Sequence, residues 1–195
     1  MHEIFIESYT VPIRELREKY NNVPIINTTY AGQDPSFVFL SPMYPHGDIP
    51  VPFTNPQLTA ASVEAIWQGL KVFEYEGAQL DEASLSKYGC KNIKRRSNLY
   101  RGKILGHQHG TDTAAPLFNL MEARAYIYAP TYLWQLDHKC QKCLSKLRAM
   151  LNQTDIVLLE AGRPAEIADP KVPLRHTELI RAYLYDEYPD IFNFI

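Results

Sequence analysis

The chain has 195 residues, of which 46% are hydrophobic, 22% charged and 12% aromatic. This length and composition exclude a largely disordered chain and predict a single folded domain over residues 1–195. The net charge of −2 and the sequence pI near 6.3 argue against an extended nucleic-acid surface, because no global positive field would attract nucleic acid or an anionic membrane.

The sequence also bears on the compartment. The first ten residues lack the basic stretch followed by an apolar run that marks a signal peptide. No segment approaches the roughly 20 apolar residues that a membrane-spanning helix needs. An odd number of cysteines, three, is unlike the disulfide framework of a secreted protein. We therefore expect a cytoplasmic protein that does not contact membranes.

The expected elements follow from hydrophobic spacing, capping residues and glycine or proline breaks. In chain order they are a strand over 2–7, a helix from Thr10 to about Tyr20, strands over 23–26 and 37–40, helices over 60–75 and 81–88, helices over 114–128 and 131–152 separated by Pro130, a strand over 155–160 and a helix over 176–187. Helices dominate and no alternating βαβ pattern is visible. The predicted fold class is α+β, mostly α, with a few short strands.

A proline-rich segment lies between Ser41 and Pro56, which contains five prolines and one glycine. Proline lacks the amide donor and fixes φ, so this segment is predicted to be an ordered surface loop, and long loops in compact domains are often functional. Tyr44 and Asp48 are its candidate ligand-binding residues. For Asp48, a purely structural role in a turn after Gly47 is the main alternative.

The sequence SVEAIWQGLKVF (62–73) has the spacing of an amphipathic helix. Its apolar stripe contains Val63, Ile66, Trp67 and Leu70. Glu64, Gln68 and Lys71 repeat that spacing one residue later. Seven residues make nearly two helical turns, so Glu64 and Lys71 are expected to share one helix face beside Trp67. The alternative is an ordinary solvated edge of a surface helix.

This stretch resembles the signature helix of the NADAR superfamily, in which a Glu is followed after six residues by a Lys and then by a Phe. The corresponding residues are Glu64, Lys71 and, one place later, Phe73. Phe-Leu-Ser at 39–41 and LRAMLNQTDIVLLEA at 147–161 are similar to other parts of that family, so the resemblance spans about residues 36–185. The resemblance implies cleavage of N-glycosidic bonds in riboflavin-pathway intermediates, or action on ADP-ribose attached to a base.

One segment departs from the family pattern. The family carries a Trp-Gly turn and a Gly-Lys-Asn loop near its C-terminal end, whereas residues 163–184 contain neither Trp nor Gly. The residues available in their place are Asp169, Arg175, His176 and Thr177.

Cleavage of a sugar–nitrogen bond needs a carboxylate for the oxocarbenium-like state and a proton for the departing nitrogen. With the resemblance, this chemistry assigns Glu64 as the catalytic carboxylate, with Lys71 positioning the ligand. The remaining candidates are substrate-binding residues: Gln68 beside Glu64, Trp67 and Tyr44 for stacking on a base, Asp48 as a second carboxylate, Arg95, Arg96 and Arg101 for phosphate, Arg124 for a buried anion, and His107 in the turn between Gly106 and Gly110.

Cys140 and Cys143 form a C-x-x-C, with His138 before it and Cys90 upstream. A single pair of this kind, expected in mid-helix, is a weak zinc signal, so neither metal nor cofactor is expected.

The sequence therefore predicts an N-glycosidase-type hydrolase whose ligand is a small nucleotide-derived molecule or an ADP-ribosylated base. Two alternatives stay open. One is a non-catalytic binder of ADP-ribose-like nucleotides, and the other is a helical interaction protein. The sequence leaves the oligomeric state undecided.

Overall fold

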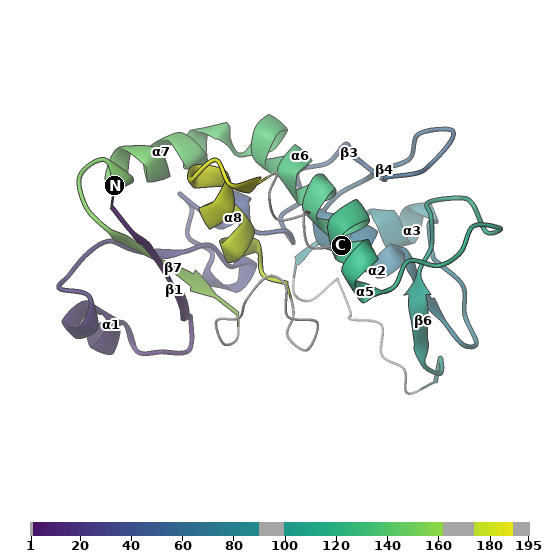
Figure 1. The fold of residues 1–195 in the computed structure, drawn as a ribbon, viewed down its shortest axis with the longest axis horizontal. Coiled ribbons are helices and arrows are strands. Elements are labelled where there is room, and N and C mark those ends of the chain that lie inside the picture. Colours follow the sequence, from purple (N-terminus) through teal and green to yellow (C-terminus); the bar gives the residue numbers. More distant parts are fainter. Residues whose placement is uncertain (1, 90–99, 162–173, 189–195) are drawn as a thin grey trace. The chain divides into compact units, whose positions relative to one another are not determined.

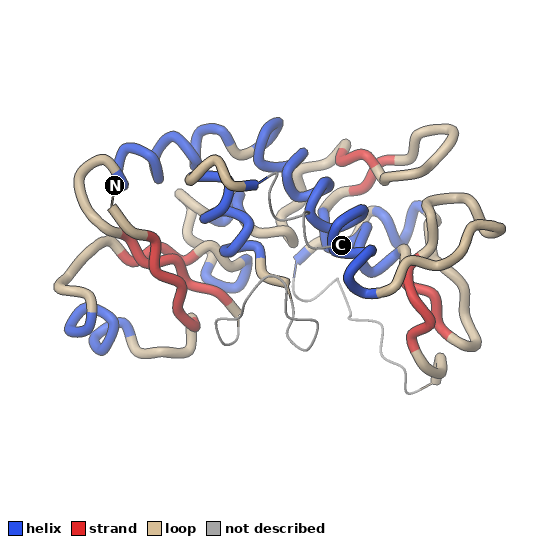
Figure 2. Tube along the Cα trace, in the orientation of Figure 1, coloured by secondary structure: helices blue, strands red, loops and turns tan. Residues whose placement is uncertain are grey.

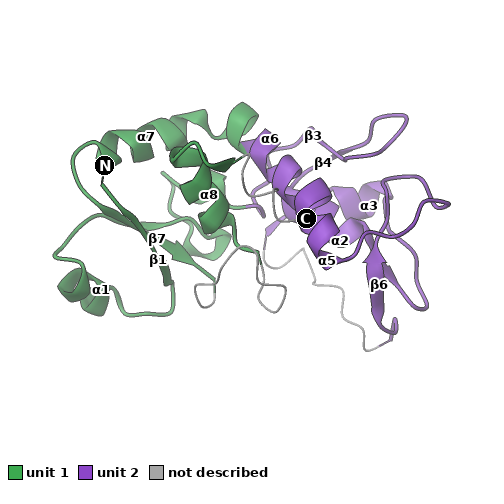
Figure 3. Ribbon diagram, viewed as in Figure 1, with its two compact units in different colours: residues 1–41, 136–194 green, residues 42–135, 195 purple. Residues whose placement is uncertain are grey.

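The computed structural model describes residues 2–89, 100–161 and 174–188, which belong to two units (Figures 1 and 3). Unit 1 comprises residues 1–41 and 136–194, and unit 2 comprises residues 42–135 with residue 195. The boundary falls within one helix, α6 (Ala129–Lys139). The predicted fold class, α+β and mostly α, is confirmed, whereas the single domain stays a prediction.

Unit 1 contains a three-stranded parallel sheet with the order β1-β7-β2, drawn in red in Figure 2. Its described elements are β1 (Ile4–Ser8), α1 (Ile13–Lys19), β2 (Ile25–Asn27), the short 3₁₀ helices η1 (Tyr30–Gly32) and η2 (Val38–Leu40), α7 (Gln141–Leu151), β7 (Ile156–Glu160) and α8 (His176–Leu184). Strands β1 and β2, joined by α1, run parallel and form a βαβ unit, and the middle strand β7 enters between them from late in the chain. The expectation that no βαβ pattern is present is therefore wrong for this segment.

Both faces of strand β7 are covered. Val157 and Leu159 pack with Leu16 of α1 in one apolar cluster. Successive side chains of a strand alternate between its faces, so Glu160 points away from that cluster. It points to α8, whose Thr177 donates a hydrogen bond to the Glu160 carboxylate. The sheet of unit 1 is therefore buried between two helices, which explains the uninterrupted apolar run of β7.

Unit 2 combines short helices with two small antiparallel sheets, β3-β4 and β5-β6. Its described elements are β3 (Ile49–Pro50), β4 (Thr59–Ala60), α2 (Val63–Gly69), β5 (Lys71–Phe73), α3 (Glu82–Leu85), β6 (Ile104–His107), α5 (Leu120–Ala123), the π-helix η3 (Arg124–Tyr128) and the first part of α6.

Helix α2 is shorter than the predicted helix over 60–75, and its N-cap is Ser62. The Ser62 hydroxyl accepts a hydrogen bond from the amide of Ala65. At the other end the amide of Gln79 donates to the carbonyl of Gly69 at 2.7 Å, and a Cβ on Gly69 would lie 2.9 Å from the Gln79 carbonyl oxygen. The returning loop thus supplies a donor to a terminal helix carbonyl that has no partner within the helix. Helix α2 ends there, so Lys71 begins a strand and is not helical.

The predicted break at Pro130 is also wrong. The chain stays helical from Leu120 through α6, and Pro130 lies in the first turn of α6. The π-helix over Arg124–Tyr128 directly precedes it, and its wider turn accommodates a residue that has no amide donor. The break comes instead at Cys140, which is the N-cap of α7.

The predicted strand over 37–40 is a 3₁₀ turn. The amides of Phe37 and Val38 both donate to the carbonyl of Asp34, whose carboxylate accepts from the amide of Ser36. An apolar run of this length fits a buried turn as well as a buried strand, so the pattern alone could not decide.

None of the helices in the described ranges combines the length and the apolar character that crossing a bilayer would require.

We expect Gly110→Ala to destabilise the protein by about 2 kcal/mol, because Gly110 has φ +54° and an added Cβ would collide with the Phe53 carbonyl. Thermal unfolding measures the change. Gly77→Ala is the control, since the added Cβ meets no described atom within 4 Å and should shift stability by less than about 0.5 kcal/mol. Equal effects of the two substitutions would contradict the assigned turn.

Candidate functional site

A row of polar side chains in unit 2 links helix α2 to strand β5. The amide Nε2 of Gln68 donates to Oε1 of Glu64 at 2.7 Å, and Nζ of Lys71 donates to Oε1 of Gln68 at 2.9 Å. Glu64 is only 8% exposed and Gln68 only 6%. The row is therefore not the solvated helix edge of the alternative interpretation. Although Lys71 lies in a strand, it reaches the same row.

The pairing of β5 with β6 sets a second row across unit 2. Lys71 lies opposite His107 in the antiparallel register, and His107 exchanges two backbone hydrogen bonds with Phe118 at 3.0 and 2.9 Å. Directly paired residues of antiparallel strands present their side chains to the same face. Lys71, His107 and Phe118 therefore project from one face of this ribbon.

Trp67 joins the helix to this ribbon. Its ring centroid lies 4.0 Å from that of His107 and 5.5 Å from that of Tyr128, which meets it edge-on. The Lys71 ammonium lies 5.7 Å from the Trp67 centroid, within cation–π range. Glu64, Lys71, Trp67 and His107 thus belong to one cluster, which we call the α2–β6 cluster together with Gln68 and Tyr128.

His107 is the unusual member of the α2–β6 cluster. It is 2% exposed, and neither ring nitrogen has a hydrogen-bond partner in the part of the chain that the structure describes. Burial, with a smaller contribution from the Lys71 charge, lowers the pKa of His107 from 6.5 to about 3. The ring is therefore neutral at physiological pH, with one donor and one acceptor nitrogen that no described group satisfies.

The other predicted site residues come from other segments of unit 2. Tyr44 contacts the ring of His46, and Asp48 is an exposed loop residue with φ +55°. Arg101 forms an ion pair of 2.8 Å with Glu76, and Arg124 is buried with Nη1 3.6 Å from Met121 Sδ. Arg95 and Arg96 lie outside the described residues.

The thiols of the C-x-x-C are buried in unit 1. Cys140 donates to the carbonyl of Phe39, and Cys143 donates to that of Ser36. Burial raises the pKa of Cys143. In residues 2–89, 100–161 and 174–188, no group of three or more His, Cys, Asp or Glu side chains is arranged to hold a metal ion.

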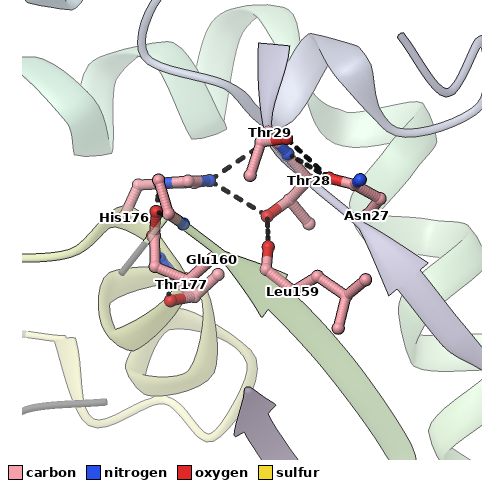
Figure 4. Close-up of polar contacts among 8 residues, drawn as sticks. Asn27, Thr28, Thr29, Leu159, Glu160, His176 and Thr177 are labelled. Atoms are coloured by element: carbon pink, nitrogen blue, oxygen red, sulfur yellow. Dashed lines mark hydrogen bonds and ion pairs between the residues drawn. The ribbon is translucent and has the colours of Figure 1, made fainter. Parts of the chain in front are cut away.

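A second buried polar cluster lies in unit 1 and contains His176 and Thr177, which the sequence offered in place of the family's pocket-forming turns (Figure 4). Nδ1 of His176 lies 2.7 Å from Oε2 of Glu160, and Nε2 lies 3.0 Å from the Thr28 hydroxyl. That hydroxyl donates to the Leu159 carbonyl, so Nε2 of His176 is the donor to Thr28. Glu160 also accepts from Ala161 and Thr177, and this pattern favours a carboxylate paired with a doubly protonated imidazole.

Burial raises the pKa of Glu160, but the charge and hydrogen bond of His176 and the backbone donors outweigh it, so the pKa lies below its usual value. Every polar side-chain atom of Thr28, Glu160 and His176 has a partner. The cluster therefore fastens α8 to the sheet. The sequence signals were a Glu that ends an apolar strand and the separately noted His176 and Thr177, but nothing local in the sequence joins these distant segments.

The two clusters differ in what they leave unsatisfied. In unit 1 the buried ion pair is complete, whereas in the α2–β6 cluster the two nitrogens of a buried imidazole find no partner among the described residues. Leaving a buried polar group without a hydrogen bond costs about 1–3 kcal/mol, and such groups concentrate where a ligand completes the network. We therefore take the α2–β6 cluster as the candidate site.

Residues 8–180 match the model of the Family of unknown function (DUF6939). No curated protein and no solved structure matches the chain. The matched range spans all the described elements that supply the α2–β6 cluster and the Glu160–His176 pair.

We expect Glu160→Gln to destabilise the protein by about 3 kcal/mol at neutral pH, because it leaves the buried His176 without its carboxylate. The depressed pKa of Glu160 means that its stabilisation is present above the unfolded carboxyl pKa and is lost as pH falls through the folded value. The difference from wild type should therefore shrink in strong acid. Denaturant unfolding at several pH values measures it.

Glu18→Gln is the matched control, since it breaks an exposed ion pair with Arg14. Such pairs contribute about 0–1 kcal/mol. A loss of stability in Glu160→Gln no greater than in this control would contradict the role of the Glu160–His176 pair in joining α8 to the sheet.

We expect His107→Phe to leave the fold intact and to weaken the acid sensitivity of stability. In the wild type the folded pKa of about 3 lies below the unfolded value of 6.5, so the unfolded state takes up a proton first as pH falls. Stability is lost from pH 6.5 downward, and phenylalanine removes this contribution. Thermal midpoints at pH 8 and pH 5 measure the effect, with exposed His138→Gln as the control. An unchanged pH dependence in His107→Phe would contradict the assigned neutral ring.

Proposed function

Because the chain belongs to the Family of unknown function (DUF6939), no relative supplies an activity, and we propose from the α2–β6 cluster that the protein is an N-glycosidase-type hydrolase. Its substrate is a nucleotide-derived molecule that carries an ADP-ribosyl or ribosyl-phosphate group. One observation carries the proposal. The buried carboxylate Glu64 is held by Gln68 in a row that ends in an ammonium, next to a tryptophan and an unsatisfied neutral histidine.

The reaction requires the sugar carbon to lose nitrogen and gain oxygen. The glycosidic carbon–nitrogen bond breaks, water supplies a hydroxyl to the sugar carbon, and the remaining proton of that water ends on the departing nitrogen. The sugar ring carries positive charge in the transition state. In the proposal Glu64 faces that charge and accepts the proton of the attacking water, and its hydrogen bond from Gln68 holds the carboxylate in one orientation.

Lys71 has the positioning role in this proposal. Its ammonium is held between the Gln68 carbonyl and the Trp67 ring, so the positive charge has a fixed place beside the carboxylate. A fixed ammonium binds a phosphate or a sugar hydroxyl of the substrate without first being ordered, which reduces the entropic cost of binding.

His107 serves the departing base. A neutral imidazole offers one donor and one acceptor, which match the mixed edge of a heterocyclic base better than a phosphate. Stacking on Trp67 fixes the plane of the imidazole ring. Hydrogen bonds with the base would satisfy the two ring nitrogens of His107. Binding would thereby remove the free-energy cost of burying these nitrogens without a described partner.

A non-catalytic binder of ADP-ribose-like nucleotides is the second candidate. The observation in its favour is the absence of Trp and Gly from residues 163–184, where the NADAR superfamily carries ligand-pocket turns. Membership of that superfamily, a cytoplasmic location and a nucleotide-derived partner all remain parts of the proposal.

The test is hydrolysis of two substrates, ADP-ribosylated guanosine and a ribosylaminopyrimidine phosphate, followed by chromatography of the released base. We expect turnover with at least one of them and a loss of about 100-fold or more in Glu64→Gln. Glutamine keeps an oxygen that accepts from Gln68, so the variant should fold normally, which circular dichroism checks.

Glu82→Gln is the matched control, because it makes the same chemical change at an exposed position of α3 and should retain wild-type turnover. Binding without turnover in the wild type, measured by calorimetry, would establish the non-catalytic binder. Turnover that survives in Glu64→Gln would refute the assigned carboxylate.

A further inference from the structure

Phe53 is a large apolar side chain displayed to solvent at an energetic cost. It is 50% exposed and has φ +59°, a conformation that a bulky residue rarely adopts. Exposed aromatic area and backbone strain both disfavour this arrangement. Strain of this kind persists only where the surrounding structure enforces it, and it concentrates at ligand-binding positions.

The loop that carries Phe53 is held by a dense set of hydrogen bonds. The Thr54 hydroxyl and the Gln57 side-chain amide both donate to the Val51 carbonyl, at 2.9 and 2.8 Å, and the Leu58 amide donates to the Thr54 hydroxyl at 2.9 Å. In the segment that follows β6, the Thr111 amide donates to the Phe53 carbonyl at 3.3 Å. The ring is therefore presented by a preorganised backbone, so a ligand that stacks on it pays little for ordering the loop.

Other rings surround Phe53. His109 stacks on Phe118 with centroids 3.5 Å apart and an interplanar angle of 17°, and Phe53 lies 5.6 Å from each of them. Tyr126 is 47% exposed, and its ring centroid lies 5.4 Å from that of Phe118. Two exposed rings thus border the stack of the half-buried His109 on the buried Phe118, which is the arrangement of a platform for a planar group.

This platform adjoins the α2–β6 cluster. Phe118 is paired with His107 across the ribbon, and their side chains belong to the face from which Lys71 also projects. The Trp67 and His107 rings meet at a tilt and Phe118 stacks on His109, and the His107–Phe118 backbone pair places these two ring groups next to each other on that face. A ligand bound at Trp67 and His107 can extend along this face.

We propose that Phe53, His109, Phe118 and Tyr126 form a second planar-ring subsite, which holds an aromatic heterocycle of the substrate other than the one released from the sugar. The inference rests on the proposed function and narrows its substrate class to nucleotide-derived molecules that carry two heterocycles. When the single base of a ribosyl phosphate is bound at the reaction centre for release, this subsite stays empty.

The test uses the fluorescent etheno derivative of AMP as the probe and follows its fluorescence quenching on the full chain. Phe53→Asn is the first variant, because Asn tolerates the left-handed backbone and preserves the loop. Tyr126→Ala is the second. Each should weaken probe binding by about 5- to 100-fold, the range expected for loss of one stacking partner.

Tyr75→Ala is the matched control, since Tyr75 is 74% exposed and, within the described chain, its ring contacts none of the four subsite residues. It should bind the probe as the wild type does. Ribose phosphate, which has no aromatic ring, should show the same affinity for the wild type and for Phe53→Asn.

Failure of this inference is distinguishable from failure of the proposed function. Probe binding that is unchanged in Phe53→Asn and Tyr126→Ala overturns the subsite, whatever the turnover. Self-association that depends on Phe53, seen by sedimentation without probe binding, also overturns it in favour of a contact between copies of the chain. A third outcome is probe binding that depends on Phe53 and Tyr126 and is equal in the wild type and Glu64→Gln, with no hydrolysis by either protein. This outcome supports the subsite and refutes the N-glycosidase.

Discussion

The antiparallel pairing of β5 with β6 is the constraint on which the candidate site depends. Lys71 directly follows helix α2, and its register opposite His107 brings the end of that helix against a strand from much later in the chain. Trp67 then packs on His107, and Gln68 connects Glu64 to Lys71. A shift of one residue in this register would turn Lys71 and His107 to opposite faces and separate the row from the ring.

The buried polar groups of the two units show how such groups divide between stability and binding. The Glu160–His176 pair is complete, with partners for each side-chain polar atom, and it joins α8 to a sheet that is apolar elsewhere. His107 is buried to a similar degree but has no hydrogen-bond partner for either nitrogen within the described residues. A fully satisfied network rigidifies a fold, whereas an incomplete one carries a cost that a ligand can remove.

The aromatic side chains of unit 2 extend the candidate site from its buried residues to the protein surface. Rings run from Tyr128 and Trp67 through His107 to the stack around Phe118, and they pass from the interior to the exposed Phe53. Aromatic rings offer a large flat area and only two side-chain torsions, so they bind planar groups at a low entropic cost. Among the described tyrosines, Tyr126 and Tyr128 contact these rings, and Tyr132 stacks on Tyr128.

Much of the local structure could be predicted from the sequence. The spacing of Glu64 and Gln68 placed them on one helix face, as the structure confirms, and the apolar run ending at Glu160 identified β7. These features depend on backbone periodicity and on burial, which neighbouring residues determine among themselves. Only the tertiary structure ended α2 at Gly69, through a loop that returns from Gln79, and made Lys71 a strand residue. It alone paired Lys71 with His107 and Glu160 with His176, because such contacts depend on which distant segments meet, and no local pattern encodes that choice.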